Sequence, residues 1–231
     1  MTQIFCDTSD IKIIKKCISL YKVNGVTTNP SIMRGDGVKN YKSHCLKILK
    51  ITKKLPLSVE VFADKPREIL NQANKISKWN KYLYVKVPIL NTRGKILTPI
   101  IKKLHNKKIK LNITAVFTFS QIQNIKKSIK KKTPVIISIF CGRIADNGLD
   151  PEIIIKKTIK LFKNYKNVKI LWASTREVFN YYQAKKNKCH IITMGPKFIE
   201  KLRARKIPLN KYSIQTVKQF YNDGKKSKFN I

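Results

Sequence analysis

Polar side chains recur near the carboxyl ends of several short apolar runs, two residues apart. The pairs are Thr27 with Asn29, Ser58 with Glu60, Asn112 with Thr114, and Ser174 with Arg176, and Ser138 and Phe140 repeat the spacing. Residues i and i+2 of a β-strand point to the same face, and burying an unpaired polar group costs free energy. A single pair can serve a loop backbone, but the repetition predicts a polar pocket built from several strands.

Lys86 is the member of this set with the clearest chemistry. It lies between Val85 and Val87 and is followed by Pro88. Apolar surroundings disfavour the ammonium form of lysine, and the neutral amine is the form that attacks a carbonyl carbon. We therefore predict that Lys86 is a nucleophile that forms a Schiff base. A structural ion pair with Glu60 or Asp7 is the alternative, and it is compatible with catalysis.

The elements that must position these residues alternate along the chain. Eight short apolar runs predict strands at residues 4–6, 25–27, 57–62, 83–87, 111–117, 135–140, 170–173 and 191–193. Amphipathic runs between them predict helices at 11–21 and after Asp150-Pro151, and at 40–53, 66–79, 95–107, 120–131, 176–186, 196–204 and 213–225. Strands that alternate with helices indicate a parallel sheet covered by helices.

We predict the α/β class: a single (β/α)₈ barrel domain over residues 1–231, with a C-terminal helix beyond strand eight. The carboxyl ends of the strands carry the active site in such barrels, and the polar pairs lie there. An open, doubly wound sheet is the alternative. The chain has neither the GxGxxG motif nor the phosphate-binding loop that such a sheet often carries.

Charge is the most unusual property of the composition. Lys and Arg number 50 against 12 Asp and Glu, which gives a net charge of +38. The lysines spread along the helical segments, on the faces opposite the apolar positions, where solvated charge is expected. No nucleic-acid recognition motif accompanies them. We expect attraction of anionic substrates and no specific nucleic-acid partner, and we keep a basic nucleic-acid-associated protein as a remote alternative.

Several other classes of protein are disfavoured. No apolar run reaches the length of about 18 residues that a membrane span needs, and the first residues lack the features of a signal peptide. We therefore expect a cytoplasmic protein without a membrane partner. The five cysteines form no CxxC pair, and the three histidines lack metal-ligand spacing. We predict buried free cysteines, no metal site and no cofactor.

Five motifs, in this order, resemble the short-chain transaldolase family, which includes fructose-6-phosphate aldolases. They are Asp7-Thr8, the segment GVTTNPS at 25–31, Val85-Lys-Val-Pro88, Leu111-Asn-Ile-Thr114 and Phe140-Cys-Gly-Arg143. The resemblance covers nearly the whole chain, and GVTTNPS is its most specific part. Cys141, the run 172–176 and Met194-Gly195-Pro196 depart from the usual residues and leave the exact sugar open.

The resemblance implies roles for individual residues. Lys86 would form the imine with a ketose, Asp7 would act as acid and base, and Glu60 and Thr114 would position water. Substrate-binding residues implied in the same way are Thr27, Asn29, Ser58, Asn112, Ser138, Phe140, Arg143, Ser174 and Arg176. Among these, Asn29 and Asn112 would hold hydroxyls, and Arg143, Ser174 and Arg176 would hold phosphate.

The resemblance also implies an activity. It is the transfer of a dihydroxyacetone unit between phosphorylated sugars, of the pentose phosphate pathway type: sedoheptulose 7-phosphate and glyceraldehyde 3-phosphate to erythrose 4-phosphate and fructose 6-phosphate. Glu60 and Phe140 are of the transaldolase type, whereas the aldolases tend to have Gln and Tyr there. A fructose-6-phosphate-aldolase-like lyase is the alternative. The resemblance further implies a ring-like homo-oligomer.

Overall fold

The computed structural model describes residues 1–227 and contains a closed barrel of eight parallel strands in sequential order. The strands are β1 (Gln3–Asp7), β2 (Gly25–Thr27), β3 (Leu57–Glu60), β4 (Leu83–Pro88), β5 (Leu111–Val116), β6 (Val135–Ile139), β7 (Val168–Trp172) and β8 (Ile191–Met194). Each predicted strand is present, and β1 pairs with β8 to close the ring. The predicted (β/α)₈ class is confirmed; the last four residues of the predicted domain lie outside the described part.

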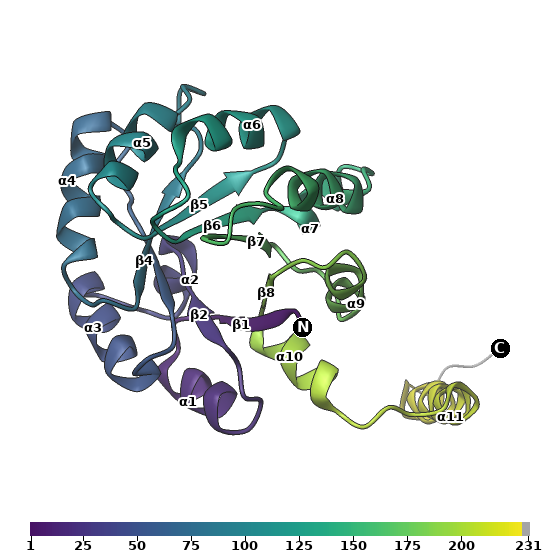
Figure 1. The fold of residues 1–231 in the computed structure, drawn as a ribbon. Coiled ribbons are helices and arrows are strands. Elements are labelled where there is room, and N and C mark those ends of the chain that lie inside the picture. The colour runs from purple at the N-terminus through teal and green to yellow at the C-terminus, as the bar shows by residue number, and fades with distance from the viewer. Residues whose placement is uncertain (228–231) are drawn as a thin grey trace.

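Helices surround the ring (Figure 1). They are α1 (Ile11–Ser19), α2 (Pro30–Gly35), α3 (Tyr41–Thr52), α4 (Pro66–Ser77), α5 (Thr98–Asn106), α6 (Phe119–Ser128), α7 (Cys141–Asp146), α8 (Pro151–Leu161), α9 (Phe179–Lys186), α10 (Pro196–Arg203) and α11 (Leu209–Ser227). Two short helices, α2 and α7, were not predicted. Both directly follow strands and begin at the pocket end of the barrel.

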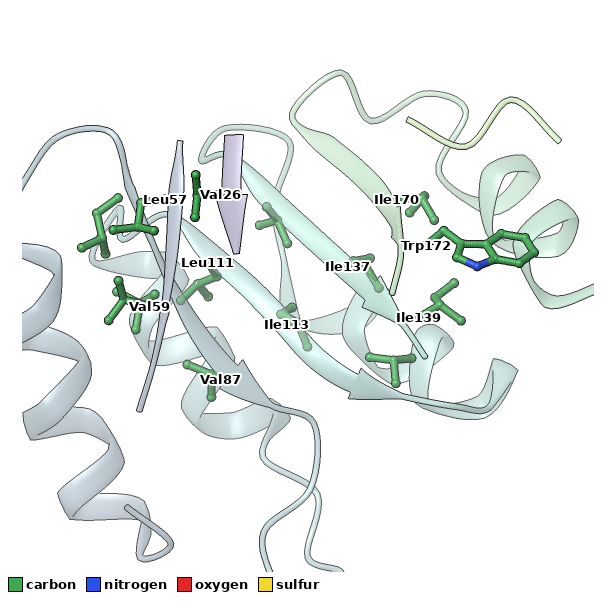
Figure 2. Close-up of a cluster of buried hydrophobic side chains, with 14 of the residues drawn as sticks. Val26, Leu57, Val59, Val87, Leu111, Ile113, Ile137, Ile139, Ile170 and Trp172 are labelled. Carbon is green, nitrogen blue, oxygen red and sulfur yellow. The ribbon is translucent and has the colours of Figure 1, made fainter. Parts of the chain in front are cut away.

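The main core lies between the strands and the outer helices. Alternate strand residues point outward and are apolar, as Leu83, Val85 and Val87 of β4 illustrate. Figure 2 shows such side chains, among them Val26 of β2, Val87 of β4 and Ile170 of β7. Because outward positions take the apolar residues, Lys86 and its counterparts at i and i+2 must face the barrel interior.

The barrel interior has an apolar layer beneath its polar layer. Phe5, Ile136, Leu171 and Ile191 form a small buried cluster there. Gly25 makes room for it, because a Cβ at this position would lie 2.7 Å from the Phe5 ring. The packed layer closes the barrel from below, so the polar residues above it form the floor of a cavity open at one end.

The two ends of the barrel differ in charge. The loops that lead from helices into strands are 20–24, 53–56, 78–82, 107–110, 129–134, 162–167 and 187–190; each contains lysine, and none contains Asp or Glu. Of the 12 acidic residues, all but Glu200 and Asp223 lie between the carboxyl end of a strand and the first turn of the longer helix that follows it, with the short helices α2 and α7 counted as part of these connections. Acidic groups are therefore concentrated at the end that carries the pocket.

Helix α11 stands apart from the barrel (Figure 1). None of its residues is buried, and Leu209, Val217 and Phe220 are 86%, 62% and 66% exposed. None of the described helices is long and apolar enough to cross a membrane. All five cysteines are free and buried, as predicted.

Candidate active site

A cavity of about 520 Å³ opens at the carboxyl ends of the strands. All the predicted site residues except Ser58 line it: Asp7, Thr27, Asn29, Glu60, Lys86, Asn112, Thr114, Ser138, Phe140, Arg143, Ser174 and Arg176. The in-register polar residues are thus brought together as predicted. Among the described residues, no group of three or more His, Cys, Asp or Glu could hold a metal ion.

Lys86 lies at the centre of this polar layer. In the strand register it is flanked by Glu60 of β3 and Asn112 of β5. Its Nζ lies 3.1 Å from Glu60 Oε2 and donates a hydrogen bond of 2.9 Å to the carbonyl oxygen of Thr28. The residue is only 6% exposed. The two oxygen partners hold the buried amine at the wall of the cavity.

Asp7 ends β1 and accepts a hydrogen bond of 2.6 Å from the Thr27 hydroxyl. Thr27 Oγ1 also lies 2.5 Å from Thr193 Oγ1. Because Thr27 has one hydroxyl proton and donates it to Asp7, Thr193 must donate to Thr27. Burial raises the pKa of Asp7 above its usual value, against the opposing effects of Lys86 and of the Thr27 hydrogen bond. A carboxyl group with a raised pKa can both accept and return a proton.

Asn112, on β5, is held by serines on β3 and β6. Its Nδ2 donates to Ser58 Oγ at 3.0 Å, and Ser138 Oγ donates to its Oδ1 at 2.6 Å. All three residues are at most 3% exposed. Ser58 therefore lies behind Asn112 and orients it, which explains why Ser58 does not line the cavity.

Thr114 has a buried hydroxyl oxygen without a hydrogen-bond partner in the described structure. The next residue, Ala115, has a φ of 54°, and the pairing of β5 with β6 shifts register between Ile113 and Val116. Such bulges re-aim side chains next to active sites. An unpaired buried hydroxyl costs free energy. A water or substrate atom in the cavity that Thr114 lines would supply the missing hydrogen-bond partner.

Two arginines line the outer part of the cavity. Arg143, in α7, places its guanidinium carbon 5.5 Å from the centre of the Phe140 ring. Arg176 follows β7 and pairs with Asp146 at the end of α7, with Nη2 2.6 Å from Oδ2. Guanidinium groups bind phosphate oxygens through paired N–H donors. The two side chains give the cavity mouth a positive character.

Close backbone contact joins the elements that carry these arginines. A Cβ on Gly142 would lie 1.6 Å from the carbonyl oxygen of Ser174. Ser174 itself has a φ of 63°, in the left-handed region. Only glycine at 142 lets α7 approach the segment after β7 so closely.

Three details of the sequence prediction are wrong. Ser174 and Arg176 do not share a strand face, because β7 ends at Trp172 and the chain turns at Ser174. Asn29 lies beyond β2 and caps α2, with its Oδ1 accepting from the Ile32 amide at 2.9 Å. Phe140 likewise follows β6. Gly142, Phe198 and Thr193 were missed; of these, only Thr193 had a sequence signal, as a polar residue at a strand end.

Comparison with known proteins gives a consistent result. The family model described as transaldolase/fructose-6-phosphate aldolase matches residues 4–231. A protein of Herpetosiphon aurantiacus named "Probable transaldolase" is 33% identical over 93% of this chain and 92% of its own length. A "Probable transaldolase" of Nitrosopumilus maritimus is 30% identical over 98% of this chain and 96% of its own.

Solved structures show the shared fold alone. The structure of 2,3-dimethylmalate lyase, a member of the PEP mutase/isocitrate lyase superfamily, aligns with a TM-score of 0.60 at 8% sequence identity. The alignment covers 99% of this chain and 84% of that one.

Proposed function

Because the chain belongs to the transaldolase/fructose-6-phosphate aldolase family and is an enzyme of the transaldolase type, we propose that Lys86 carries its Schiff base. The donor is a ketose phosphate and the acceptor an aldose phosphate, with a dihydroxyacetone unit transferred between them. The observation that carries this proposal is a buried lysine whose Nζ lies 3.1 Å from a carboxylate, inside a polar cavity.

The first step is attack of Lys86 Nζ on the ketose carbonyl carbon. Water leaves, and the C–N double bond of the imine remains. Glu60 stabilises the ammonium form between turnovers and accepts a proton when the amine becomes neutral, since its Oε2 is in contact with Nζ. The Asn112 amide, fixed by Ser58 and Ser138, donates to a hydroxyl of the bound ketose.

Asp7 performs the carbon–carbon cleavage. It takes the proton of the hydroxyl on the carbon beyond the scissile bond, and the bonding electrons move into the imine. The aldose phosphate leaves, and the enamine of dihydroxyacetone stays on Lys86. Asp7 returns the proton when an acceptor aldehyde adds. Its raised pKa suits both directions of transfer.

Thr114 and Glu60 position a water that assists the formation of the imine and later hydrolyses it. The unpartnered hydroxyl of Thr114 lines the same cavity as the Glu60 carboxylate. Hydrogen bonds to both groups would orient a water towards the imine carbon. Strand alternation supports this role, because Thr114 lies two residues after Asn112 on the inward face of β5.

Arg143, Ser174 and Arg176 bind the substrate phosphate at the cavity mouth. Both guanidinium groups and the Ser174 backbone lie on segments that Gly142 holds in contact. This placement is on the side of the cavity formed by β6 and β7, across the barrel from β2 and β3. An extended sugar phosphate can thus reach Lys86 with its carbonyl and the arginines with its phosphate.

Borohydride trapping tests the assignment of Lys86. With fructose 6-phosphate and borohydride, the reduced imine should add a stable mass to the peptide that contains Lys86. Lys86→Ala should lose the adduct and transfer activity. Lys110→Ala is a matched control, because Lys110 precedes β5 at the opposite end of the barrel. Full activity of Lys86→Ala would refute the proposal.

A fructose-6-phosphate-aldolase-like lyase is the second candidate, and Phe140 argues against it. The ring lines the cavity and offers no hydroxyl to protonate the bound carbon nucleophile or to orient water. Capture by an acceptor aldehyde therefore dominates over release of free dihydroxyacetone. We further propose that the enzyme serves sugar phosphate exchange of the pentose phosphate type and that it works in the cytoplasm.

Helix α11 supports a homo-oligomer. Ile214, Val217 and Tyr221 follow a helical repeat on one face and are more than half exposed. Most of the stability of a helix in a protein comes from the packing of its apolar face. A second copy of the chain supplies the covering surface. Light scattering should give a mass above 26.8 kDa, and Val217→Glu should lower it towards the monomer.

A further inference from the structure

Arg176 is held from behind by a carboxylate that does not face the cavity. Its Nε donates to both carboxylate oxygens of Asp146, at 3.1 and 3.0 Å, and its Nη2 donates to Oδ2 at 2.6 Å. Arg176 lines the cavity, whereas Asp146 is not among the lining residues. One edge of the guanidinium is therefore occupied on the outer side, and Nη1 remains for a ligand.

We propose that Asp146 is a positioning residue that fixes the Arg176 guanidinium in the orientation in which it receives the phosphate of a sugar substrate. The proposal rests on the phosphate role of Arg176 in the proposed function. Asp146 itself does not touch the substrate. It acts by holding a long side chain that would otherwise be free to rotate.

The backbones of both residues are fixed relative to each other. Asp146 ends α7, and Gly142 in the same helix contacts the carbonyl of Ser174. The backbone N–H of Arg176 donates to Asn180 Oδ1 at 2.9 Å. The side chain of Arg176 is nevertheless 48% exposed, and within residues 1–227 the hydrogen bonds of its guanidinium all go to Asp146. The backbone contacts fix the main chain of the phosphate site, and the contact with Asp146 fixes the Arg176 guanidinium.

Asp146 stays ionised under working conditions. Its hydrogen bonds from Arg176 lower the pKa of its carboxyl group, and the charges of Arg176 and Arg143 act in the same direction. A negative charge near a phosphate site also repels the phosphate. Both members of the pair are half exposed, so water and salt screen this repulsion strongly. The orienting effect should therefore dominate.

The test compares KM and kcat for phosphorylated and unphosphorylated acceptors, erythrose 4-phosphate and erythrose. Asp146→Ala should raise KM for the phosphorylated acceptor roughly three- to tenfold, the range that ordering one long side chain represents. The kcat at saturation and the kinetics with erythrose should stay within about twofold of the wild type. Asp146→Asn, which keeps one oxygen acceptor, should give an intermediate KM.

Asp64→Ala is the matched control. Asp64 is a partly exposed carboxylate, outside the cavity, that accepts hydrogen bonds from the amide and the hydroxyl of Thr92. Its removal changes net charge by the same amount, so KM for erythrose 4-phosphate should not change. An equal effect of both substitutions would overturn the proposal, since general charge would then be the cause. A lower KM in Asp146→Ala would also overturn it.

Arg176→Ala separates this inference from the proposed function. If it leaves the preference for erythrose 4-phosphate over erythrose unchanged, the phosphate role of Arg176 fails, and the inference fails with it. If Arg176→Ala abolishes the preference while both Asp146 variants behave as wild type, only the positioning role of Asp146 is refuted. Thermal unfolding of each variant verifies that the barrel is intact.

Discussion

Replacing Gly142 by alanine would test whether backbone contact sets the phosphate site. The added Cβ would lie 1.6 Å from the Ser174 carbonyl oxygen, and real Cβ atoms essentially never approach closer than 3.0 Å. The obstacle is backbone, so no side-chain rotation relieves it. Either α7 or the segment that carries Ser174 and Arg176 must move by more than an ångström.

The cost of this movement has two parts. Overpacking of a buried position lowers the free energy of unfolding by about 1–3 kcal/mol. Displacement of a positioned group by about 1 Å can reduce catalysis about 100-fold. We therefore expect Gly142→Ala to lose stability and to lose at least about tenfold in kcat/KM for phosphorylated substrates, with a smaller loss for unphosphorylated analogues.

Urea unfolding and steady-state kinetics measure the two effects. Gly35→Ala is the control, because a Cβ at Gly35 in α2 would meet no heavy atom within 4 Å. Alanine is the better helix former, so this control should be neutral or slightly stabilising. The reasoning is refuted if Gly142→Ala unfolds and reacts like Gly35→Ala.

Three further predictions follow from the site and the core. Phe140→Tyr should raise release of free dihydroxyacetone from fructose 6-phosphate relative to transfer to erythrose 4-phosphate; each tenfold change in this ratio corresponds to about 1.4 kcal/mol between the barriers. Asp7→Asn should raise the free energy of unfolding at pH 7 while activity falls, because burial raises the pKa of Asp7 and its ionised form is disfavoured in the fold; no gain in urea denaturation would contradict this. His105 and His190 each accept a backbone N–H, and burial lowers the pKa of both. The unfolded chain therefore binds protons more readily, so the free energy of unfolding should decrease as the pH falls below about 6.5. This decrease should be smaller in the double variant His105→Gln/His190→Gln.

The strands and the central lysine could be predicted because one physical rule governs both. Outward positions such as Val85 and Val87 must be apolar to pack under helices, so a lysine between them can only face the interior. The register then brings Glu60 and Asn112 beside Lys86 without further information. The same alternation predicts the polar layer as a whole.

Features that depend on backbone geometry could not be predicted. Helix α7 has six residues, too few to show a periodic pattern. Ala115 and Ser174 adopt left-handed conformations although neither is glycine, so no residue type marks the bulge or the turn. The pairing of Asp146 with Arg176 joins the end of α7 to the segment after β7, across 30 positions of sequence. Helix α11 has the same amphipathic pattern as helices that pack on the barrel, and only the structure shows it standing apart.

The separation of charge along the barrel axis has a consequence for handling the enzyme on solid supports. The loops that lead from helices into strands contain lysine without acidic residues, whereas most carboxylates lie at the end of the barrel that carries the cavity. On a negatively charged resin or electrode the molecule should adsorb through its lysine-rich end. The cavity would then face the solution, and immobilised enzyme should keep access to its substrates without any engineered tether.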